Sequence, residues 1–390
     1  MELEKVKNIY FSLKNRIELQ SFKSYDPFDG LNSNFTRFFS FDNQLISRSI
    51  MQLVKRSPVN IRPILGIKES LIPKSMADYL AAEILINNTD SLILKNNLRN
   101  IAEKIIKHSN NDYSGISWGL PFNYASRLCF LPKNTPNIIT TAYCANSLID
   151  YYEFSNETKF LDIALTAGDF IMKDLGAITL NQNEICICYI PTKKYAVHNA
   201  NLMGASFLFR IYKYLEKEEI FAFAKKALNY SINKQRPEGS WYYGEANNLH
   251  WTDNFHTGYN LDSLYTISNN YEIPGLNHSI DIGYDYYINN FFHENGIPKF
   301  YNSRTYPIDT QTIAQAIQTL SIMSTQHNNS LKIANDILNW SLLNMYDDRG
   351  YFYSKKSKYF TSRISFIRWC QSPMLIALAH LINKNKKGQK

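Results

Sequence analysis

The apolar positions of this 390-residue chain recur at helical spacing over most of its length. The periodicity predicts helices that follow one another in pairs. We expect pairs at 75–88 with 91–108, 139–153 with 158–174, 197–214 with 217–234, 256–269 with 277–292 and 309–325 with 329–344, and a last helix at 367–383. Two further helices are predicted near the start, over residues 1–20 and 42–55.

The two helices of a pair differ in where their apolar residues lie. In the 197–214 helix, the run from Leu202 to Phe209 is apolar or small on every side, which predicts burial all round. The 217–234 helix has charged residues on one side and an apolar face on the other, formed by Ile220, Ala224, Ala227, Leu228 and Ser231. Each pair should therefore consist of an inner and an outer helix.

Polar clusters at the starts of the inner helices mark a repeat. They lie at intervals of 58, 58, 53 and 59 residues, at Thr140, His198, His256, Asp309 and Arg368. Units of two helices cannot bury their apolar faces alone, so evenly spaced pairs must stack on one another. Six pairs closed into a ring form an all-α (α/α)6 toroid, which is the predicted fold class.

No linker interrupts this pattern, so we expect a single domain over residues 1–390. Residues 1–73 should contain N-terminal helices and a loop that complete the ring. The helical pairs occupy residues 74–384, and residues 385–390 form a basic tail. Several pairs end in a glycine followed by a short aromatic strand, at Gly115, Gly239, Gly296 and Gly350. These loops and the inner-helix starts should surround a common mouth.

Composition and motifs limit the kinds of ligand and cofactor that this protein is expected to bind. The 27 Tyr and 23 Phe suit a large core and also sugar-stacking surfaces. The net charge of +8 permits an anionic ligand. No nucleic acid is expected, because there is no recognised binding module or basic stripe with interleaved aromatics. Metal-ligand spacings, a P-loop and a dinucleotide fingerprint are also missing, so neither a metal nor another cofactor is expected.

Cysteine usage and hydropathy favour the cytoplasm. The cysteines are irregularly spaced, which predicts reduced and mostly buried thiols at Cys129, Cys144, Cys186, Cys188 and Cys370. The first residues lack the apolar core of a secretory signal, and no apolar run is long enough for a transmembrane helix. We expect a cytoplasmic protein without a transmembrane segment, either free or peripheral to the membrane.

The richest polar stretch surrounds the start of the 256–269 helix. His256, Tyr259 and Asn260 stand at positions i, i+3 and i+4, which places them on one helix face. An imidazole beside a phenol can transfer a proton, and the helix N-terminus favours developing negative charge. The alternative is a capping or core histidine beside a packing tyrosine. His198 opens the preceding inner helix and is a further catalytic candidate with the same alternative.

Three acidic residues could support a different reaction. Glu245 follows an aromatic strand and is either an acid/base, a ligand for sugar hydroxyls or a solvated loop residue. With Asp253 or Asp262 it could form the carboxylate pair of a glycosidase. Their spacing along the chain does not define their separation in space.

The last two inner-helix starts add further candidates. Asp309 is an expected N-cap. Arg363 and Arg368, with the neighbouring Trp369, could bind a carboxylate or phosphate in a bidentate fork, or could form structural ion pairs.

The order of several motifs carries a resemblance that covers roughly residues 40–384. The motifs are Trp118–Phe122 with Ser126–Arg127, Val197–Leu202, Gln235–Trp241, Tyr243–Glu245, Phe255–Leu261, Tyr306–Asp309 and Arg368–Trp369. In this order they resemble the VpsJ-type polysaccharide biosynthesis proteins. The resemblance implies an α/α toroid and a role in making an exopolysaccharide, capsule or O-antigen-like glycan. It carries over no catalytic residue.

The chain is more loosely similar to D-glucuronyl C5-epimerases and toroidal polysaccharide lyases. This similarity rests on the toroid, on the joints that bear Tyr and His, and on the Arg-Trp stretch near the C-terminus. It implies that Tyr259 or His256 removes a uronate C5 proton, and that Arg368 or Arg363 binds the carboxylate.

The functional hypothesis is a carbohydrate-active enzyme of surface or extracellular polysaccharide biosynthesis. It would be an epimerase or lyase for a glycan or a nucleotide- or lipid-linked sugar, including an anionic one, in peripheral association with polysaccharide assembly machinery. A glycoside hydrolase and a non-catalytic glycan-binding or assembly protein are the alternatives. The predicted catalytic residues are His256, Tyr259, His198 and Glu245. The predicted substrate-binding residues are Trp118, Arg127, Asn201, Trp241, Trp251, Asp253, Asn260, Asp262, Asp309, Arg363, Arg368 and Trp369.

Overall fold

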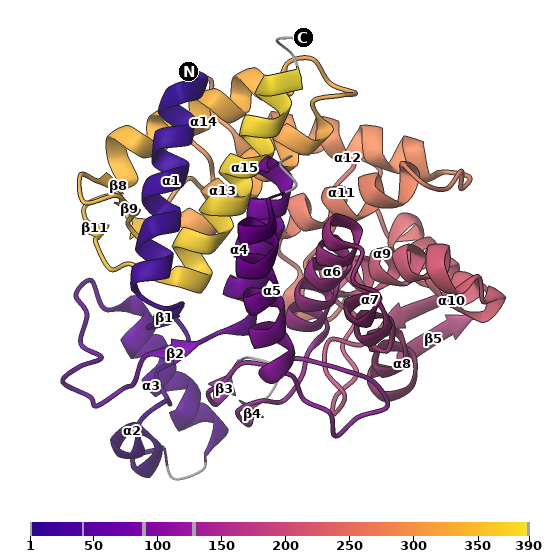
Figure 1. Cartoon of the computed structure of the whole chain (residues 1–390), viewed down its shortest axis with the longest axis horizontal. Helices are drawn as coiled ribbons and strands as arrows, with labels where there is room; N and C mark the ends of the chain where they lie inside the picture. Colours follow the sequence, from indigo (N-terminus) through magenta and orange to yellow (C-terminus); the bar gives the residue numbers. More distant parts are fainter. Residues whose placement is uncertain (1, 41–42, 88–90, 127–129, 388–390) are drawn as a thin grey trace.

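The computed structural model describes residues 2–40, 43–87, 91–126 and 130–387, most of which are helical. Six helices form an inner layer (Figure 1): α4 (Pro73–Ile86), α6 (Ile138–Ser155), α9 (His198–Leu215), α11 (Asn254–Ser268), α13 (Thr310–Met323) and α15 (Ser372–Lys387). Six lie outside them: α1 (Leu3–Leu19), α5 (Leu92–Lys107), α7 (Thr158–Leu165), α10 (Glu218–Asn233), α12 (Leu276–Phe291) and α14 (Ser330–Met345). Short helical segments, α8 (Ala167–Asp169) and η1 (Phe170–Leu175), extend α7.

The inner layer is a closed ring. Each inner helix packs against the next in chain order, and α15 packs against both α13 and α4. Five outer helices pack on the inner helix of their own pair, while α1 packs on α15. The first and last helices of the chain therefore form the sixth pair, and the predicted (α/α)6 toroid is confirmed.

Burial along the helices agrees with the predicted difference between inner and outer helices. Along α9, Leu202, Gly204, Ala205 and Phe207–Phe209 are buried, and only Met203 and Ser206 of that run are half-buried. On α10 the buried positions include every residue of the predicted face, Ile220, Ala224, Ala227, Leu228 and Ser231. The central part of the inner helix α9 is thus buried around most of its circumference, whereas the outer helix α10 buries one stripe.

The loop glycines make close contacts that join one pair to the next. A Cβ on Gly239 would lie 2.0 Å from the carbonyl oxygen of Ile282 in α12, the following outer helix. A Cβ on Gly350 would lie 2.0 Å from the hydroxyl of Ser12 in α1, which continues the pattern across the ring closure. Two other loops approach the next outer helix in the same way, at Gly115 and Gly296.

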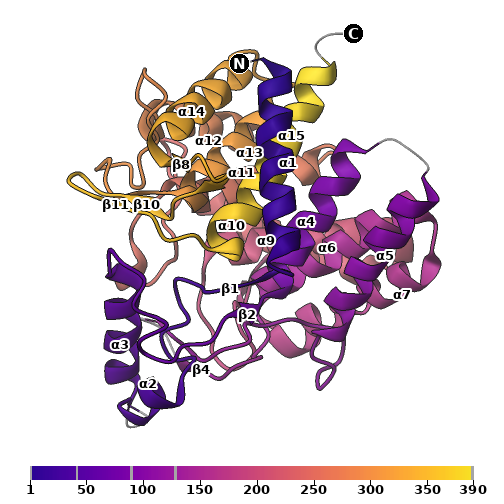
Figure 2. The same cartoon turned by 60° about the vertical axis from the view of Figure 1, so that its left-hand side comes forward.

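Part of the N-terminal region lies differently from the prediction. Only α1 joins the ring, while the rest of residues 20–72 lies across the face where the inner helices begin (Figure 2). We call this part the N-terminal cap. It contains α2 (Asn34–Phe38), α3 (Gln44–Arg56) and the pair of strands β1 (Lys23–Ser24) and β2 (Ser70–Leu71). A helix such as α3, with a single buried stripe at Ser47, Met51 and Val54, cannot serve as an inner helix.

Short strands line the same face. They form the pairs β3 (Tyr124–Ala125) with β4 (Phe130–Leu131), β5 (Ala177–Asn181) with β6 (Glu184–Ile187) and β8 (Tyr346–Asp347) with β9 (Tyr351–Phe352), and the triplet β7 (Ile308–Asp309), β10 (Lys355–Lys356) and β11 (Thr361–Ser362).

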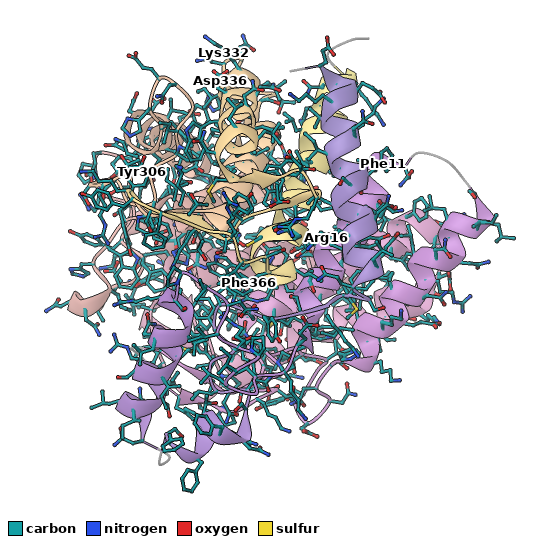
Figure 3. The ribbon with its side chains drawn as sticks, turned by 90° about the vertical axis from the view of Figure 1, so that its left-hand side faces the viewer. Phe11, Arg16, Tyr306, Lys332, Asp336 and Phe366 are labelled. Carbon is teal, nitrogen blue, oxygen red and sulfur yellow. The ribbon has the colours of Figure 1, made fainter. Side chains whose placement is uncertain are left out.

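The cap is tied to the C-terminal part of the chain. The backbone N–H of Ile367 donates to Ser24 Oγ at 3.0 Å, and Lys355 Nζ donates to the carbonyl of Lys55 at 3.3 Å. Figure 3 views this junction with Arg16 and Phe366 labelled: Arg16 of α1 lies over the Tyr351 ring, and Phe366 lies beneath the guanidinium of Arg62 from the cap.

The cysteines and the hydropathy of the helices were also predicted from the sequence. The four cysteines of the described ranges are free and buried, as predicted, at Cys144, Cys186, Cys188 and Cys370. Cys129 lies outside the described residues. Within those ranges, no helix has both the length and the apolarity that crossing a bilayer requires.

Candidate functional site

An ordered carboxylate–imidazole pair stands at the first turn of α11. Asp253 is the N-cap, and its Oδ1 accepts the backbone N–H of His256 at 3.0 Å. Its Oδ2 lies 2.7 Å from Nδ1 of the same histidine and accepts Nε1–H of Trp251 at 3.0 Å. The carboxylate is 2% exposed and the imidazole 20%. We call Asp253 and His256 the dyad.

The dyad sets the chemical state of the imidazole. A carboxylate only accepts hydrogen bonds, so Nδ1 carries the proton of the neutral ring and Nε2 keeps its lone pair. No hydrogen bond to Nε2 is formed within the described part of the chain. His256 is thus an oriented and partly exposed base. The sequence pattern placed the helix start at His256, two residues late, because it missed the capping role of Asp253.

Tyr259 lies next to His256 on α11, with ring centroids 6.3 Å apart. Gln311 Nε2 donates to the phenol oxygen at 2.8 Å, and the ring of Tyr143 in α6 lies 6.4 Å from the Tyr259 ring, centroid to centroid. Burial raises the pKa of Tyr259, so the phenol keeps its proton at neutral pH. Because Gln311 donates to the oxygen, the hydrogen of Tyr259 remains to be donated elsewhere.

Arg368 lies in η3 (Ile367–Gln371), a π-helical turn that leads into α15. Its Nε and Nη2 donate to the two oxygens of Asp26 at 2.6 and 2.7 Å. Asp26 belongs to the N-terminal cap and is 1% exposed. The fork that was predicted to hold a substrate carboxylate therefore already holds a carboxylate of the protein itself.

Asp309 is the N-cap of α13, as predicted, and accepts the backbone N–H of Thr312 at 2.9 Å. Its other oxygen accepts Nε1–H of Trp369 at 3.3 Å. Burial raises the pKa of Asp309. The cap contributes Lys55, whose ammonium lies 4.0 Å from the Phe28 ring centroid. Burial lowers the pKa of Lys55 to about 8. Nothing in the sequence had placed Lys55 at the mouth.

Aromatic rings connect these groups. Trp251 stacks on Tyr243 at 4.7 Å with an interplanar angle of 12°, and Tyr243 contacts the His256 ring at 4.5 Å. Phe255 lies 6.1 Å from Trp369, which in turn contacts Phe28 of the cap at 5.2 Å. Faces of this kind, next to hydrogen-bonding groups, are suited to the apolar surfaces of sugar rings.

Asn260 and Asp262 lie deeper in α11. Asn260 is 3% exposed, and its Oδ1 has no hydrogen-bond partner in the described ranges. Asp262 Oδ2 accepts from Gln315 at 2.7 Å and from Gln318 at 3.2 Å, while its Oδ1 is equally unpartnered there. Burial raises the pKa of Asp262 to about 7. Asp262 faces α13 and makes no ion pair with Glu245.

The structure contains a buried ion pair in α4 that was not predicted from the sequence. Lys74 Nζ lies 2.9 Å from Asp78 Oδ2 and 3.9 Å from the ring centroid of Tyr143. Ser372 of α15 donates to the same carboxylate at 2.8 Å. Asp78, a charged residue on the predicted 75–88 helix, was the signal that could have revealed this pair.

His198 has a different setting from His256. It is 1% exposed, its Nδ1 lies 3.0 Å from Ser231 Oγ, and its Nε2 lies 2.8 Å from Glu245 Oε1. The hydrogen bond from His198 lowers the pKa of Glu245. Asn201 is fully buried and bonded to the backbone of Ile187 and Ala227. Both ring nitrogens of His198 are therefore occupied, and Asn201 holds α9 to its neighbours.

Trp118 and Trp241 occupy equivalent core positions. Trp118 is 0% exposed and donates to the carbonyl of Ile105 in α5, and Trp241 is 2% exposed and donates to the carbonyl of Ser231 in α10. Each indole thus satisfies a carbonyl near the end of an outer helix. Buried in this way, neither ring offers a face to a ligand.

Two predicted substrate-binding residues remain, Arg363 and Arg127. Arg363 is exposed, and its guanidinium lies 5.5 Å from the Tyr353 ring centroid. Arg127 lies outside the described residues. Within the described ranges, no group of three His, Cys, Asp or Glu side chains is arranged to hold a metal ion.

Comparison with known proteins gives likeness in structure only. No protein-family model matches the sequence, and no curated protein matches it. A cellobiose 2-epimerase from Bacillus thermoamylovorans is similar with a TM-score of 0.62 at 13% identity, over 81% of this chain and 88% of that one. The GH76 α-mannanase BT2949 of Bacteroides thetaiotaomicron is similar with a TM-score of 0.63 at 10% identity, over 82% and 88%.

An unsaturated glucuronyl hydrolase specific for heparin is similar over 100% of this chain and 98% of that one, with a TM-score of 0.62 at 12% identity. At such identities the likeness establishes the fold and no particular activity. The chain shares its α/α toroid with an epimerase and with two hydrolases that act on carbohydrates.

Proposed function

We propose that this protein is a carbohydrate-active enzyme that removes a proton from a sugar carbon, as a uronate C5-type epimerase or a lyase. The observation that carries the proposal is the dyad. Asp253 holds Nδ1 of His256 at 2.7 Å, and this arrangement leaves Nε2 as an oriented base in a 20% exposed side chain. The toroidal fold shared with carbohydrate-active enzymes supports the substrate class.

The chemistry follows from the protonation states. His256 Nε2 accepts the proton of a carbon next to a carboxylate, and the electron pair moves towards that carboxylate. The dipole at the start of α11 stabilises the negative charge that develops. Tyr259 then donates its phenolic hydrogen, either to the opposite face of the carbon in an epimerase or to the leaving oxygen in a lyase.

The hydrolase alternative has weaker support. A glycosidase needs one carboxyl group that stays protonated near neutral pH. The pKa of Glu245 is instead lowered, first by its hydrogen bond to His198, and Asp253 already accepts three hydrogen bonds. Burial raises the pKa of Asp262 to about 7, but Gln315 and Gln318 hold this carboxyl against α13, and it makes no contact with Glu245. The aromatic faces of Trp251 and Tyr243 would serve a purely binding protein equally well.

We propose that the enzyme acts in surface-polysaccharide biosynthesis, with a glycan or a nucleotide- or lipid-linked sugar as substrate. We further propose a cytoplasmic location, peripheral to polysaccharide assembly machinery. The buried free thiols of Cys144, Cys186, Cys188 and Cys370 support a reducing compartment.

The test is hydrogen–deuterium exchange into the sugar. The protein would be incubated in D2O with uronate-containing oligosaccharides and nucleotide sugars, and deuterium at carbon would be measured by mass spectrometry. We expect His256→Ala and Tyr259→Phe each to slow exchange by about 10²–10⁴-fold. His250→Ala and Tyr265→Phe are matched controls, because His250 is exposed and Tyr265 bonds to Thr325 at the other end of α11.

Three outcomes distinguish the functions. Exchange that survives both His256→Ala and Tyr259→Phe would contradict the proposal. Hydrolysis that is lost in Glu245→Gln but retained in His256→Ala would point to a glycosidase. Binding of a glycan with neither exchange nor cleavage would point to a binding protein.

A further inference from the structure

The N-terminal cap exposes an unusual concentration of large apolar side chains. Those that are at least one-third exposed include Phe35, Phe38, Phe39, Leu45, Ile46, Leu53, Val59 and Ile64. We call these eight residues the α2–α3 apolar surface. They lie within 30 consecutive positions, whereas the rest of the described chain contributes nine such residues from scattered places. An apolar surface of this kind on a folded protein usually marks an interaction site.

The two faces of α3 show that this exposure is systematic. Ser47, Met51 and Val54 are buried towards the toroid. On the opposite face, Leu45 and Leu53 are each 71% exposed. A helix that is apolar on both faces, with only one of them covered by its own protein, is suited to a second apolar environment.

The charge around this surface indicates what that environment is. The cap, residues 20–72, contains seven Lys and Arg and four Asp and Glu, so it supplies +3 of the net charge of +8. Two of its acidic residues, Asp26 and Asp29, are buried and paired with Arg368 and Arg62. Arg48 and Arg56 lie on α3 itself. Cations beside exposed Phe and Leu side chains are typical of segments that lie in the interface of an anionic bilayer.

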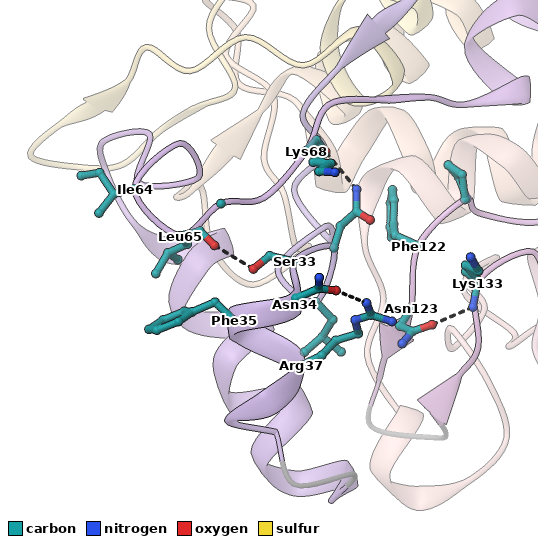
Figure 4. Close-up of a pocket in the computed structure, with 14 residues that line it drawn as sticks. Ser33, Asn34, Phe35, Arg37, Ile64, Leu65, Lys68, Phe122, Asn123 and Lys133 are labelled. Carbon is teal, nitrogen blue, oxygen red and sulfur yellow. Dashed lines mark hydrogen bonds between the residues drawn. The ribbon is translucent and has the colours of Figure 1, made fainter.

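A basic cavity adjoins the apolar surface (Figure 4). It has a volume of about 560 Å³ and is lined on one side by α2 and residues 64–68 of the cap, and on the other by residues 121–123 and 133. Arg37, Lys68 and Lys133 line it, and none of its lining residues is acidic. Arg37 donates to Asn34, and none of the three cations forms an ion pair within the described chain. Phe35 and Ile64 also line the cavity.

We propose that the cap docks this protein on an anionic lipid bilayer. The α2–α3 apolar surface enters the interfacial region, and the cavity holds the phosphate of a lipid headgroup between Arg37, Lys68 and Lys133. The amide nitrogens of Asn34 and Asn123 supply further hydrogen-bond donors there, since only the oxygens of these two amides are used within the described chain. The proposal does not depend on the catalytic function. Because the cap also lies at the face where the inner helices begin, docking would bring that face close to the membrane surface.

Vesicle co-sedimentation of the full chain tests the proposal. We expect binding to phosphatidylglycerol vesicles that weakens between about 0.1 and 0.5 M salt, and little binding to phosphatidylcholine vesicles. Leu45→Ser with Leu53→Ser should lower the affinity by about tenfold or more. Leu343→Ser is the matched control, because Leu343 is 86% exposed on the helix α14, outside the cap.

The cavity is tested by charge reversal. Lys68→Glu and Lys133→Glu should each lower vesicle affinity by about fivefold or more, whereas Lys225→Glu, on the exposed side of α10, should not. Inorganic phosphate at millimolar concentration should compete with the vesicles for the cavity. Phosphate binding without any vesicle binding would overturn the proposal.

Two other results would also overturn it. One is equal binding to both vesicle types, or an equal loss of binding in Leu343→Ser. The other is a dimer in solution, measured by light scattering, that Leu45→Ser with Leu53→Ser dissociates, because a second copy of the chain would then cover this surface.

Discussion

Two histidines that look equivalent in the sequence differ in one hydrogen bond. His198 and His256 both lie in the first turn of an inner helix. In His198 a serine and a glutamate occupy both ring nitrogens. In His256 the carboxylate of Asp253 holds only Nδ1. An imidazole can act as a base only through a free lone pair, so this difference selects His256 as the base of the proposed reaction.

Asp262 should make the free energy of unfolding depend on pH. Its pKa is raised to about 7 in the folded protein, above the value near 4 of an unfolded chain. The folded state therefore binds this proton more tightly, and its stabilising effect is lost as the pH rises from about 4 through about 7.

We expect Asp262→Asn to change this pH dependence. The amide cannot ionise, so the melting temperature of the variant relative to the parent should rise between pH 5 and pH 8. Thermal unfolding followed by circular dichroism at both pH values gives the comparison. A constant difference across that range would mean that Asp262 stays ionised in the folded protein.

At the scale of elements, the ring depends on loops that touch the next outer helix. Gly239 has a φ of +96°, and a Cβ there would meet the backbone of α12 at 2.0 Å. This contact fixes the angle between successive pairs, because backbone atoms on both sides leave no flexible group to move.

Gly239→Ala should therefore lower the free energy of unfolding by about 3 kcal/mol, from backbone strain and overpacking together. Gly275→Ala is the matched control. Gly275 has a φ of +79° in the left-handed region, and a Cβ there would come no closer than 4.0 Å to the nearest side chain, so only the strain of about 1 kcal/mol remains. Urea denaturation measures both, and equal losses would show that the contact with α12 has no energetic role.

At the scale of the whole molecule, one buried ion pair connects the cap to the toroid. Asp26 and Arg368 are 342 positions apart, and both lie largely out of solvent. Their bond holds the cap against the start of α15 and orders the site face.

Removing one partner of this pair should be costly. Asp26→Ala leaves the Arg368 charge buried without its carboxylate, so we expect a loss of about 3–5 kcal/mol in the free energy of unfolding. Asp169→Ala breaks an exposed pair with Lys173 and should cost less than about 1 kcal/mol. Limited proteolysis should also show faster cleavage between residues 20 and 72 in Asp26→Ala alone. Unchanged cleavage would mean that other contacts hold the cap.

Local patterns were enough to predict the ring of helical pairs. The apolar stripe of α10 and the fully apolar run of α9 are short-range features, and the even spacing of the polar joints is visible along the sequence itself. Residues three and four apart share a helix face in any fold, so periodicity predicts each helix without knowledge of its neighbours. The Asp309 cap was predictable for the same reason.

The sequence by itself thus determined the (α/α)6 toroid and the approximate chain positions at which its inner helices begin. Only the tertiary structure decided which side chains there are free to react. In the tertiary structure Asp26 pairs with Arg368 and Glu245 bonds to His198. Trp118 and Trp241 lie in the core. Asp26 meets Arg368 because the ring closes and the cap folds back over it. A residue's hydrogen-bond partners are set by such distant segments, and no local pattern records them.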